Sequence, residues 1–116
     1  MQMKEFSTRV VTFKLAAALE KYELDLRALA DTWVDAECFR RIQQEFGEMR
    51  ILGASLPKLS VSWVAVLVSR TRLLQALCSR TAAPAFLVLQ EHLAAVESLR
   101  QRCLRSIGAQ GVVALA

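Results

Sequence analysis

The sequence predicts an all-α fold, an antiparallel up-down-up-down four-helix bundle that occupies residues 1–116 as a single domain. Three observations predict it. Apolar residues recur at spacings of three and four, the period of one helix face, in four successive stretches of similar length. The connections between these stretches are short, which makes neighbouring helices antiparallel. A chain of 116 residues also has the length of one domain.

The first helix is expected over residues 8–30, with Ser7 as its N-cap. No Gly or Pro precedes Gly47, so nothing in the sequence marks the end of this helix, and one bent helix that reaches Leu52 is the alternative. The apolar line that should face the other helices is spaced 4-3-4-3-4 and consists of Leu15, Leu19, Tyr22, Leu26, Leu29 and Trp33.

The second helix is expected over residues 35–52, because Asp35 offers N-cap chemistry. Gly53 fits the C′ position just after it, and the segment 53–60, which contains Pro57, is the clearest loop in the chain. The line that should face the core consists of Phe39, Ile42, Phe46 and Met49.

The third helix is expected over residues 60–79. Its first half, residues 61–68, is rich in β-branched residues and could also form a buried strand. A helical register continues beyond it, however, and a lone strand would lack a pairing partner. That register consists of Val64, Leu67, Thr71, Leu74 and Cys78. Because apolar residues surround the first half on all sides, we expect this helix to be the most buried one.

The fourth helix is expected over residues 82–107, with Thr81 as N-cap and Gly108 at C′. The tail 109–116 is apolar and is expected to be unstructured or to dock in a groove. The core-facing line is spaced 3-4-3-4-3-4 and consists of Phe86, Leu89, Leu93, Val96, Arg100, Cys103 and Ile107.

Apolar residues make up 54% of the chain and charged residues 22%. A small domain has much surface per residue, so this surplus of apolar residues predicts that another chain covers part of the surface. We expect a homodimer or a helical hetero-partner. The candidate association surface consists of Val10, Phe13 and Ala17 on the first helix and Val88, Ala95 and Leu99 on the fourth.

The formal charge of +4 is unevenly distributed, because residues 54–116 carry seven basic and only two acidic side chains. One end of the bundle should therefore form a patch for an anion or an acidic partner. Its candidate residues are Arg50, Lys58, Arg100, Arg102 and Arg105. Arg100 also occupies a core-facing position, where it should either stack on Trp63 or pair with Glu45 or Glu48.

Residue types that act in catalysis or that bind metal ions or cofactors are sparse in this sequence. We therefore expect no catalytic site, no metal site and no cofactor. Cys38, Cys78 and Cys103 fall at apolar positions and are predicted to be small buried residues. The carboxylates Glu20, Glu23, Glu45 and Glu48 lie beside basic residues and are expected to be solvated.

The only histidine, His92, is predicted to lie at the edge of the core. Histidine phosphotransfer domains are also helical bundles with one helical histidine. Their histidine is followed by a Lys and a Gly, whereas here Leu, Ala, Ala and Val follow.

The longest uncharged run within a helix, residues 59–69, is about half of the ~20 residues that a membrane span needs. Lys14 interrupts the apolar run near the N-terminus, so no signal peptide is expected. We therefore expect no membrane span and a cytoplasmic location.

These observations predict a non-enzymatic interaction protein, a small cytoplasmic adaptor, regulator or assembly subunit that acts through helix packing. A nucleic-acid-associated protein that uses the basic patch is a less favoured alternative, because few aromatic residues accompany the arginines. A phosphotransfer-like or small-anion-binding bundle is a second alternative.

Overall fold

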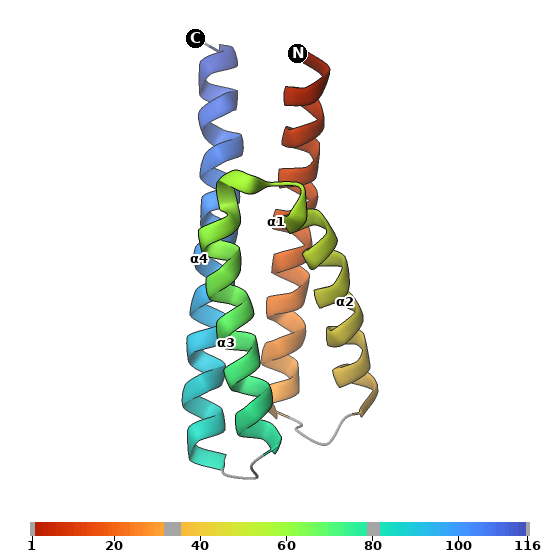
Figure 1. Cartoon of the computed structure of the whole chain (residues 1–116), viewed down its shortest axis with the longest axis vertical. Helices are drawn as coiled ribbons and strands as arrows, with labels where there is room; N and C mark the ends of the chain where they lie inside the picture. Colours follow the sequence, from red (N-terminus) through yellow and green to blue (C-terminus); the bar gives the residue numbers. More distant parts are fainter. Residues whose placement is uncertain (1, 32–35, 79–81, 116) are drawn as a thin grey trace.

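In the computed structural model, the backbone is described for residues 2–31, 36–78 and 82–115, and the side chains for residues 7–29, 36–77 and 86–108. The elements are α1 (Gln2–Asp31), α2 (Ala36–Ala54), the short 3-10 helix η1 (Pro57–Leu59), α3 (Ser60–Cys78) and α4 (Ala82–Leu115) (Figure 1). The described ranges contain no strand, and residues 61–68 lie in α3. The predicted all-α fold is thereby confirmed.

The four helices form an elongated bundle that measures 52 × 23 × 21 Å. α1 packs lengthwise against both α2 and α4, and α3 packs against α4. α2 and α3 contact each other little, and Figure 1 shows them separating below the connection that joins them. Because α1 and α2 lie side by side, they are two helices, and the single bent helix is ruled out.

Two predicted helix ends are wrong. α1 begins at Gln2, so Ser7 lies inside the helix and is not its N-cap. α4 continues through Gly108 to Leu115, so the predicted tail is helical over residues 109–115. Ser and Gly permit a helix end but do not impose one, since a lone Gly inside a helix costs only about 1 kcal/mol. The predicted N-caps Asp35 and Thr81 lie outside the described residues.

The core is built from one apolar line on each helix. The predicted line of α1 is buried from Leu15 to Leu29, and Trp33 lies outside the described residues. In α4, Phe86 is 56% exposed and does not belong to the core, contrary to its predicted place. The residues of α2 and α4 that are buried in the core are Cys38, Ile42, Phe46, Met49, Leu89, Leu93, Val96, Leu99 and Cys103.

The register predicted for α3 is wrong by one position. Trp63, Val66 and Leu73 are the buried large residues of this helix, whereas Val64 is 53% exposed. The prediction that this helix is the most buried one is also wrong. The reason is tertiary: α3 packs closely only against α4, so a single face of it is covered.

The connection between α2 and α3 depends on a close approach at Gly53. This residue is buried inside α2 and is not the predicted C′ residue. A Cβ atom there would lie 3.3 Å from Cδ2 of Trp63. The Trp63 ring in turn stacks on Phe46, with centroids 5.5 Å apart and planes inclined by 20°. Because Gly53 has no side chain, the Trp63 ring of α3 can pack closely against the C-terminal end of α2.

Candidate functional site

A buried chain of hydrogen bonds joins three helices at the centre of the bundle. The Tyr22 hydroxyl of α1 lies 2.7 Å from Nε2 of His92 on α4. Nδ1 of His92 lies 2.7 Å from the Ser69 hydroxyl of α3, which also donates to the Val66 carbonyl oxygen at 3.0 Å. All hydrogens are used if Tyr22 donates to Nε2, Nδ1–H donates to Ser69, and Ser69 donates to Val66. This arrangement uses a neutral imidazole with the proton on Nδ1.

The surroundings of His92 keep it neutral. The side chain is 0% exposed, which contradicts the predicted place at the edge of the core. Burial, and secondarily the positive charge of Arg70, lowers the pKa of His92 to about 4. Burial also raises the pKa of the Tyr22 hydroxyl above its ordinary value. Both ring nitrogens of His92 are hydrogen-bonded and the ring is enclosed, so the imidazole is not accessible to solvent in this structure.

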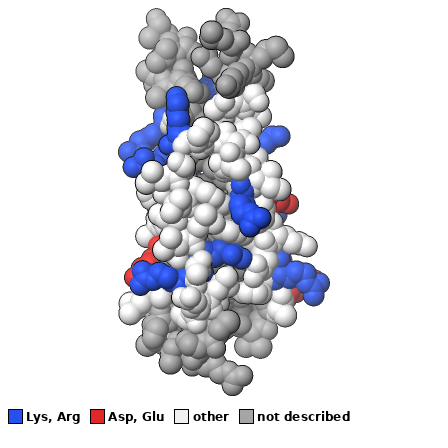
Figure 2. All heavy atoms as spheres, viewed as in Figure 1, with Lys and Arg blue, Asp and Glu red and all other residues white. Residues whose placement is uncertain are grey.

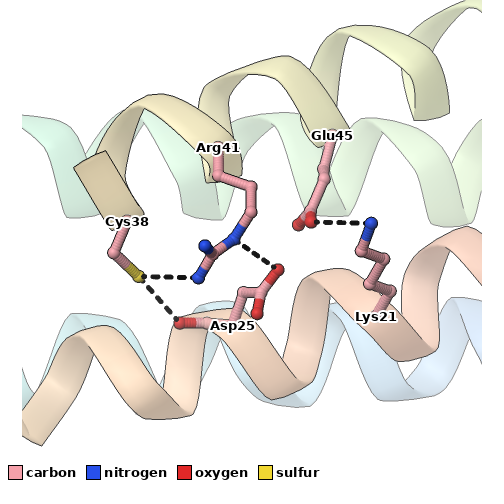
Figure 3. Close-up of polar contacts among 5 residues, drawn as sticks. All are labelled: Lys21, Asp25, Cys38, Arg41 and Glu45. Carbon is pink, nitrogen blue, oxygen red and sulfur yellow. Dashed lines mark hydrogen bonds and ion pairs between the residues drawn. The ribbon is translucent and has the colours of Figure 1, made fainter.

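A second polar cluster connects α1 to α2 (Figure 3). Nε of Arg41 lies 3.4 Å from Oδ2 of Asp25, and Nζ of Lys21 lies 3.7 Å from Oε1 of Glu45. The Cys38 thiol is buried in the same cluster and donates to the Asp25 carbonyl oxygen at 3.8 Å. The cluster has two carboxylates and two cations, so it holds the two helices together electrostatically.

Glu45 is buried in that cluster, so the prediction that it is solvated is wrong. Burial raises its pKa, and the neighbouring Asp25 carboxyl raises it further, while Lys21 and Arg41 act in the opposite direction. Glu23 is also buried, and the prediction that it is solvated is likewise wrong. It pairs with Arg27 at 3.0 Å and faces Arg100 at 3.6 Å. Glu45 thus pairs α2 with α1, and Glu23 pairs α1 with α4.

A groove lies between α2 and α3, with α1 as its floor. The residues that line it are Tyr22, Leu26, Leu29, Phe39, Ile42, Gln43, Arg70, Leu73, Leu74 and Leu77. Its hollow amounts to about 20 Å³, whereas typical small-molecule pockets enclose roughly 300–1,000 Å³. The hollow is thus too small to enclose a small molecule, and the groove is shallow.

Arg70 spans this groove from α3 to α2. Its Nη2 donates to Oε1 of Gln43 at 2.7 Å. Its guanidinium carbon lies 4.2 Å from the centre of the Phe46 ring. Among the described side chains, no carboxylate lies within ion-pair distance of it. The groove therefore contains a fixed, partly buried positive charge held by neutral partners.

The outward side of α3 carries a stripe of exposed valines. Val61, Val64 and Val68 are spaced i, i+3 and i+7 and are 82%, 53% and 54% exposed. That spacing places them on one face of the helix. Half-buried Leu67 and Leu74 continue this face toward the groove. We call Val61, Val64 and Val68 the valine stripe.

The predicted basic patch is only partly realised. Arg50, Lys58, Arg102 and Arg105 are exposed. Arg100 is turned into the contact between α1 and α4, where its Nε faces Glu23 at 3.6 Å. The prediction that Arg100 contacts Trp63, Glu45 or Glu48 is therefore wrong. Figure 2 shows basic side chains spread along the length of this face rather than gathered at one end.

The predicted association surface divides between the two helices. Phe13 is 63% exposed, and Val10 and Ala17 are exposed beside it on α1. On α4, Leu99 is fully buried in the core, and Val88 and Ala95 pack against the core. The α4 half of the prediction is wrong because α3 and α1 cover two adjacent faces of that helix.

Four members of polar clusters were not predicted from the sequence: Tyr22, Ser69, Gln43 and Arg70. One signal was present, since a Tyr at a core-facing position needs a hydrogen-bond partner for its hydroxyl. Ser69 and Gln43 carried no such signal. Their partners lie 23 and 27 residues away in the chain.

Cys38 and Cys103 are buried, as predicted, and the side chain of Cys78 lies outside the described residues. Burial raises the pKa of Cys103 to about 11, so its thiol is not reactive at neutral pH. In the described part of the chain, no group of three or more His, Cys, Asp and Glu side chains is arranged to hold a metal ion.

By length and hydropathy, none of the helices described is on its own long and apolar enough to span a membrane. One pair, Ala36–Ala54 with Pro57–Leu77, meets these criteria only when the two are taken together, and the chain bends by 114° between them. Comparisons of the chain with known protein families, with curated proteins and with solved structures find no match.

Proposed function

We propose that this chain is a non-enzymatic interaction protein that binds a partner protein by packing helices against α3. The observation that carries the proposal is the exposed valine stripe, which continues through Leu67 and Leu74 into the groove. Exposed β-branched residues at helical spacing form a contiguous apolar face, and such faces are typical of interaction surfaces.

The energetics support this proposal. Full burial of one valine side chain contributes roughly 1.5 kcal/mol or more. Burying the stripe with its two neighbouring leucines would thus supply several kcal/mol, enough to offset part of the entropy lost on association.

Two features argue against the other classes. The groove is small and the histidine is enclosed and neutral, which is unfavourable for an enzyme or a phosphotransfer protein. The basic side chains are spread out and Arg100 is engaged by Glu23, which is unfavourable for a nucleic-acid-binding patch. We propose a cytoplasmic location, supported by the free thiol of Cys103.

Affinity capture tests the proposal. The tagged chain should retain specific proteins, and nuclease treatment should not release them. Val64→Asp should abolish their retention, because it places a charge in the middle of the valine stripe. Ile51→Asp is the matched control, since Ile51 is 73% exposed on α2, away from the stripe.

Circular dichroism would first establish that both variants keep the helical fold. Equal retention by the two variants would contradict the proposed surface. Release of all captured material by nuclease would favour the nucleic-acid alternative instead.

A further inference from the structure

We propose that the groove between α2 and α3 binds an amphipathic helix of a partner protein, and that an acidic side chain on this helix pairs with Arg70. The inference rests on the proposed function and specifies its partner by chemistry: a helix with apolar residues at i, i+3 and i+7 flanked by Asp or Glu. Three properties of the groove lead to it.

The first property is an apolar wall on each side. Phe39 and Ile42 come from α2, and Leu74 and Leu77 come from α3. Below their connection, the two helices contact each other little, and the side chains of Phe39, Leu74 and Leu77 remain half-buried along the groove. An apolar groove between two helices is the surface against which the apolar face of a third helix packs.

The second property is the unneutralised charge of Arg70. Its partners include the amide oxygen of Gln43, the face of the Phe46 ring and the Tyr22 hydroxyl, and all three are neutral. A guanidinium has five N–H donors, and the bonds to Gln43 and Tyr22 use only some of them. The others can bind a carboxylate in a two-bond arrangement, which favours Asp or Glu at one defined position of the partner.

The third property is the charge of α3 as a whole. Residues 60–78 include Arg70 and Arg72 but no Asp or Glu, and Lys58 precedes them in η1. Arg72 already pairs with Glu91 of α4 at 3.2 Å. The face shown in Figure 2 accordingly carries more basic than acidic groups around its uncharged surface. A basic rim attracts an acidic partner and repels a basic one.

A protein helix fits these properties better than an anionic lipid surface. Lipid headgroups form a plane and attract basic groups at the rim of an apolar face. Arg70 instead lies between two helices and is partly buried, held from the side by Gln43 and Phe46. A charge in that position selects one carboxylate that enters the groove.

The test is a display selection of random helical peptides on the full-length protein. The selected peptides should carry an apolar i, i+3, i+7 stripe with at least one flanking Asp or Glu. Arg70→Gln should weaken their binding at least tenfold, while Arg72→Gln, the matched control on the same helix, should change it less than threefold. Changing the acidic residue of the peptide to its amide should remove the effect of Arg70→Gln, since the two groups act as a pair.

Leu74→Asp separates this inference from the proposed function. Peptides without acidic residues that need Leu74 but are indifferent to Arg70→Gln would overturn the inference and leave the proposed function standing. If no selected peptide is sensitive to Leu74→Asp or Val64→Asp, both are wrong. Thermal melts of each variant ensure that loss of binding is not loss of folding.

Two further outcomes would overturn the inference. One is self-association of the chain that Leu74→Asp abolishes, because the groove would then hold a second copy. The other is binding to phosphatidylserine vesicles that Arg70→Gln and Arg72→Gln weaken equally. The basic face would then bind an anionic lipid surface.

Discussion

At the scale of single residues, the interior of the bundle is specified by polar side chains that each find a partner on another helix. His92 is the clearest example, since its two ring nitrogens are bound by Tyr22 and Ser69 from two different helices. A buried polar group without a partner costs about 1–3 kcal/mol, so these contacts restrict how the helices can pack. The network therefore favours one arrangement of α1, α3 and α4 over others.

The neutral state of His92 makes the stability of the fold depend on pH. The pKa of His92 is lowered to about 4 in the folded chain from 6.5. The unfolded chain therefore binds this proton first as the pH falls. The stabilising contribution is present above pH 6.5 and is lost as the pH falls toward 4, by roughly 3 kcal/mol at most.

We expect urea unfolding to show this loss between pH 6.5 and 4 in the natural chain and not in His92→Gln, whose amide does not titrate. The raised pKa of Glu45 acts in the opposite direction in both proteins, so it cancels in the difference. A constant difference in unfolding free energy across this range would contradict the prediction.

Two glycines of α2 should respond differently to substitution by alanine. No atom lies within 4 Å of a Cβ added at Gly47, so Gly47→Ala should stabilise by about 0.5–1 kcal/mol through helix propensity. A Cβ at Gly53 would lie 3.3 Å from the Trp63 ring, which is held by its stacking on Phe46. Gly53→Ala should therefore bring no gain or a loss. Thermal unfolding of the two variants measures this, and an equal gain in both would show that Trp63 moves freely.

At the scale of helices, each pair is joined by a different kind of contact. α1 and α2 share the cluster of Lys21, Asp25, Arg41 and Glu45 (Figure 3). α2 and α3 are joined near their connection through the stacked rings of Phe46 and Trp63. These differences leave one side of the bundle, between α2 and α3, less closed than the others.

The contact between α1 and α4 includes the ion pair of Arg100 with Glu23, and this pair predicts a contrast between two arginines. Arg100→Ala should destabilise by roughly 1–3 kcal/mol, because it leaves the buried Glu23 carboxylate with Arg27 alone. Arg102 is exposed two residues later, so Arg102→Ala should change the unfolding free energy by less than about 0.5 kcal/mol. Denaturant titration at pH 7 compares them, and equal effects would mean that Arg100 contributes no more than a surface charge.

At the scale of the whole molecule, exposed apolar residues lie on more than one side. The valine stripe is on α3, and α1 carries Val10, Phe13 and Leu24 at compatible spacing on its exposed side. The expected surplus of apolar residues over what the core contains is thus visible on the surface. Association of two copies through α1 would leave the groove between α2 and α3 free.

We expect light scattering at micromolar concentration to give a mass above the 12.9 kDa of one chain. Phe13→Asp should shift the mass toward the monomer, because it places a charge at the centre of the exposed apolar line of α1. Ile51→Asp should leave the mass unchanged. A natural chain that scatters as a monomer at all concentrations would contradict the homodimer.

The sequence by itself determined the helical class and the lines of α1 and α2 that form the core, but it left open whether α1 and α2 are one bent helix. Helical periodicity depends on local spacing, so it can be read without knowing the partners. The same reasoning distinguished helix from strand over residues 61–68, because the apolar register continues beyond them.

Tertiary structure alone decided the register of α3, the burial of Glu23 and Glu45, and the partners of Arg70, Arg100 and His92. In a helix with apolar residues on all sides, periodicity cannot say which face is covered, since that depends on how many neighbours pack against it. Pairing of polar groups depends on the axial level of two helices, and a shift of one turn moves a side chain by about 5.4 Å. The groove between α2 and α3 also depends on the tertiary structure. The apolar periodicity of each helix does not specify how far apart the two helices lie.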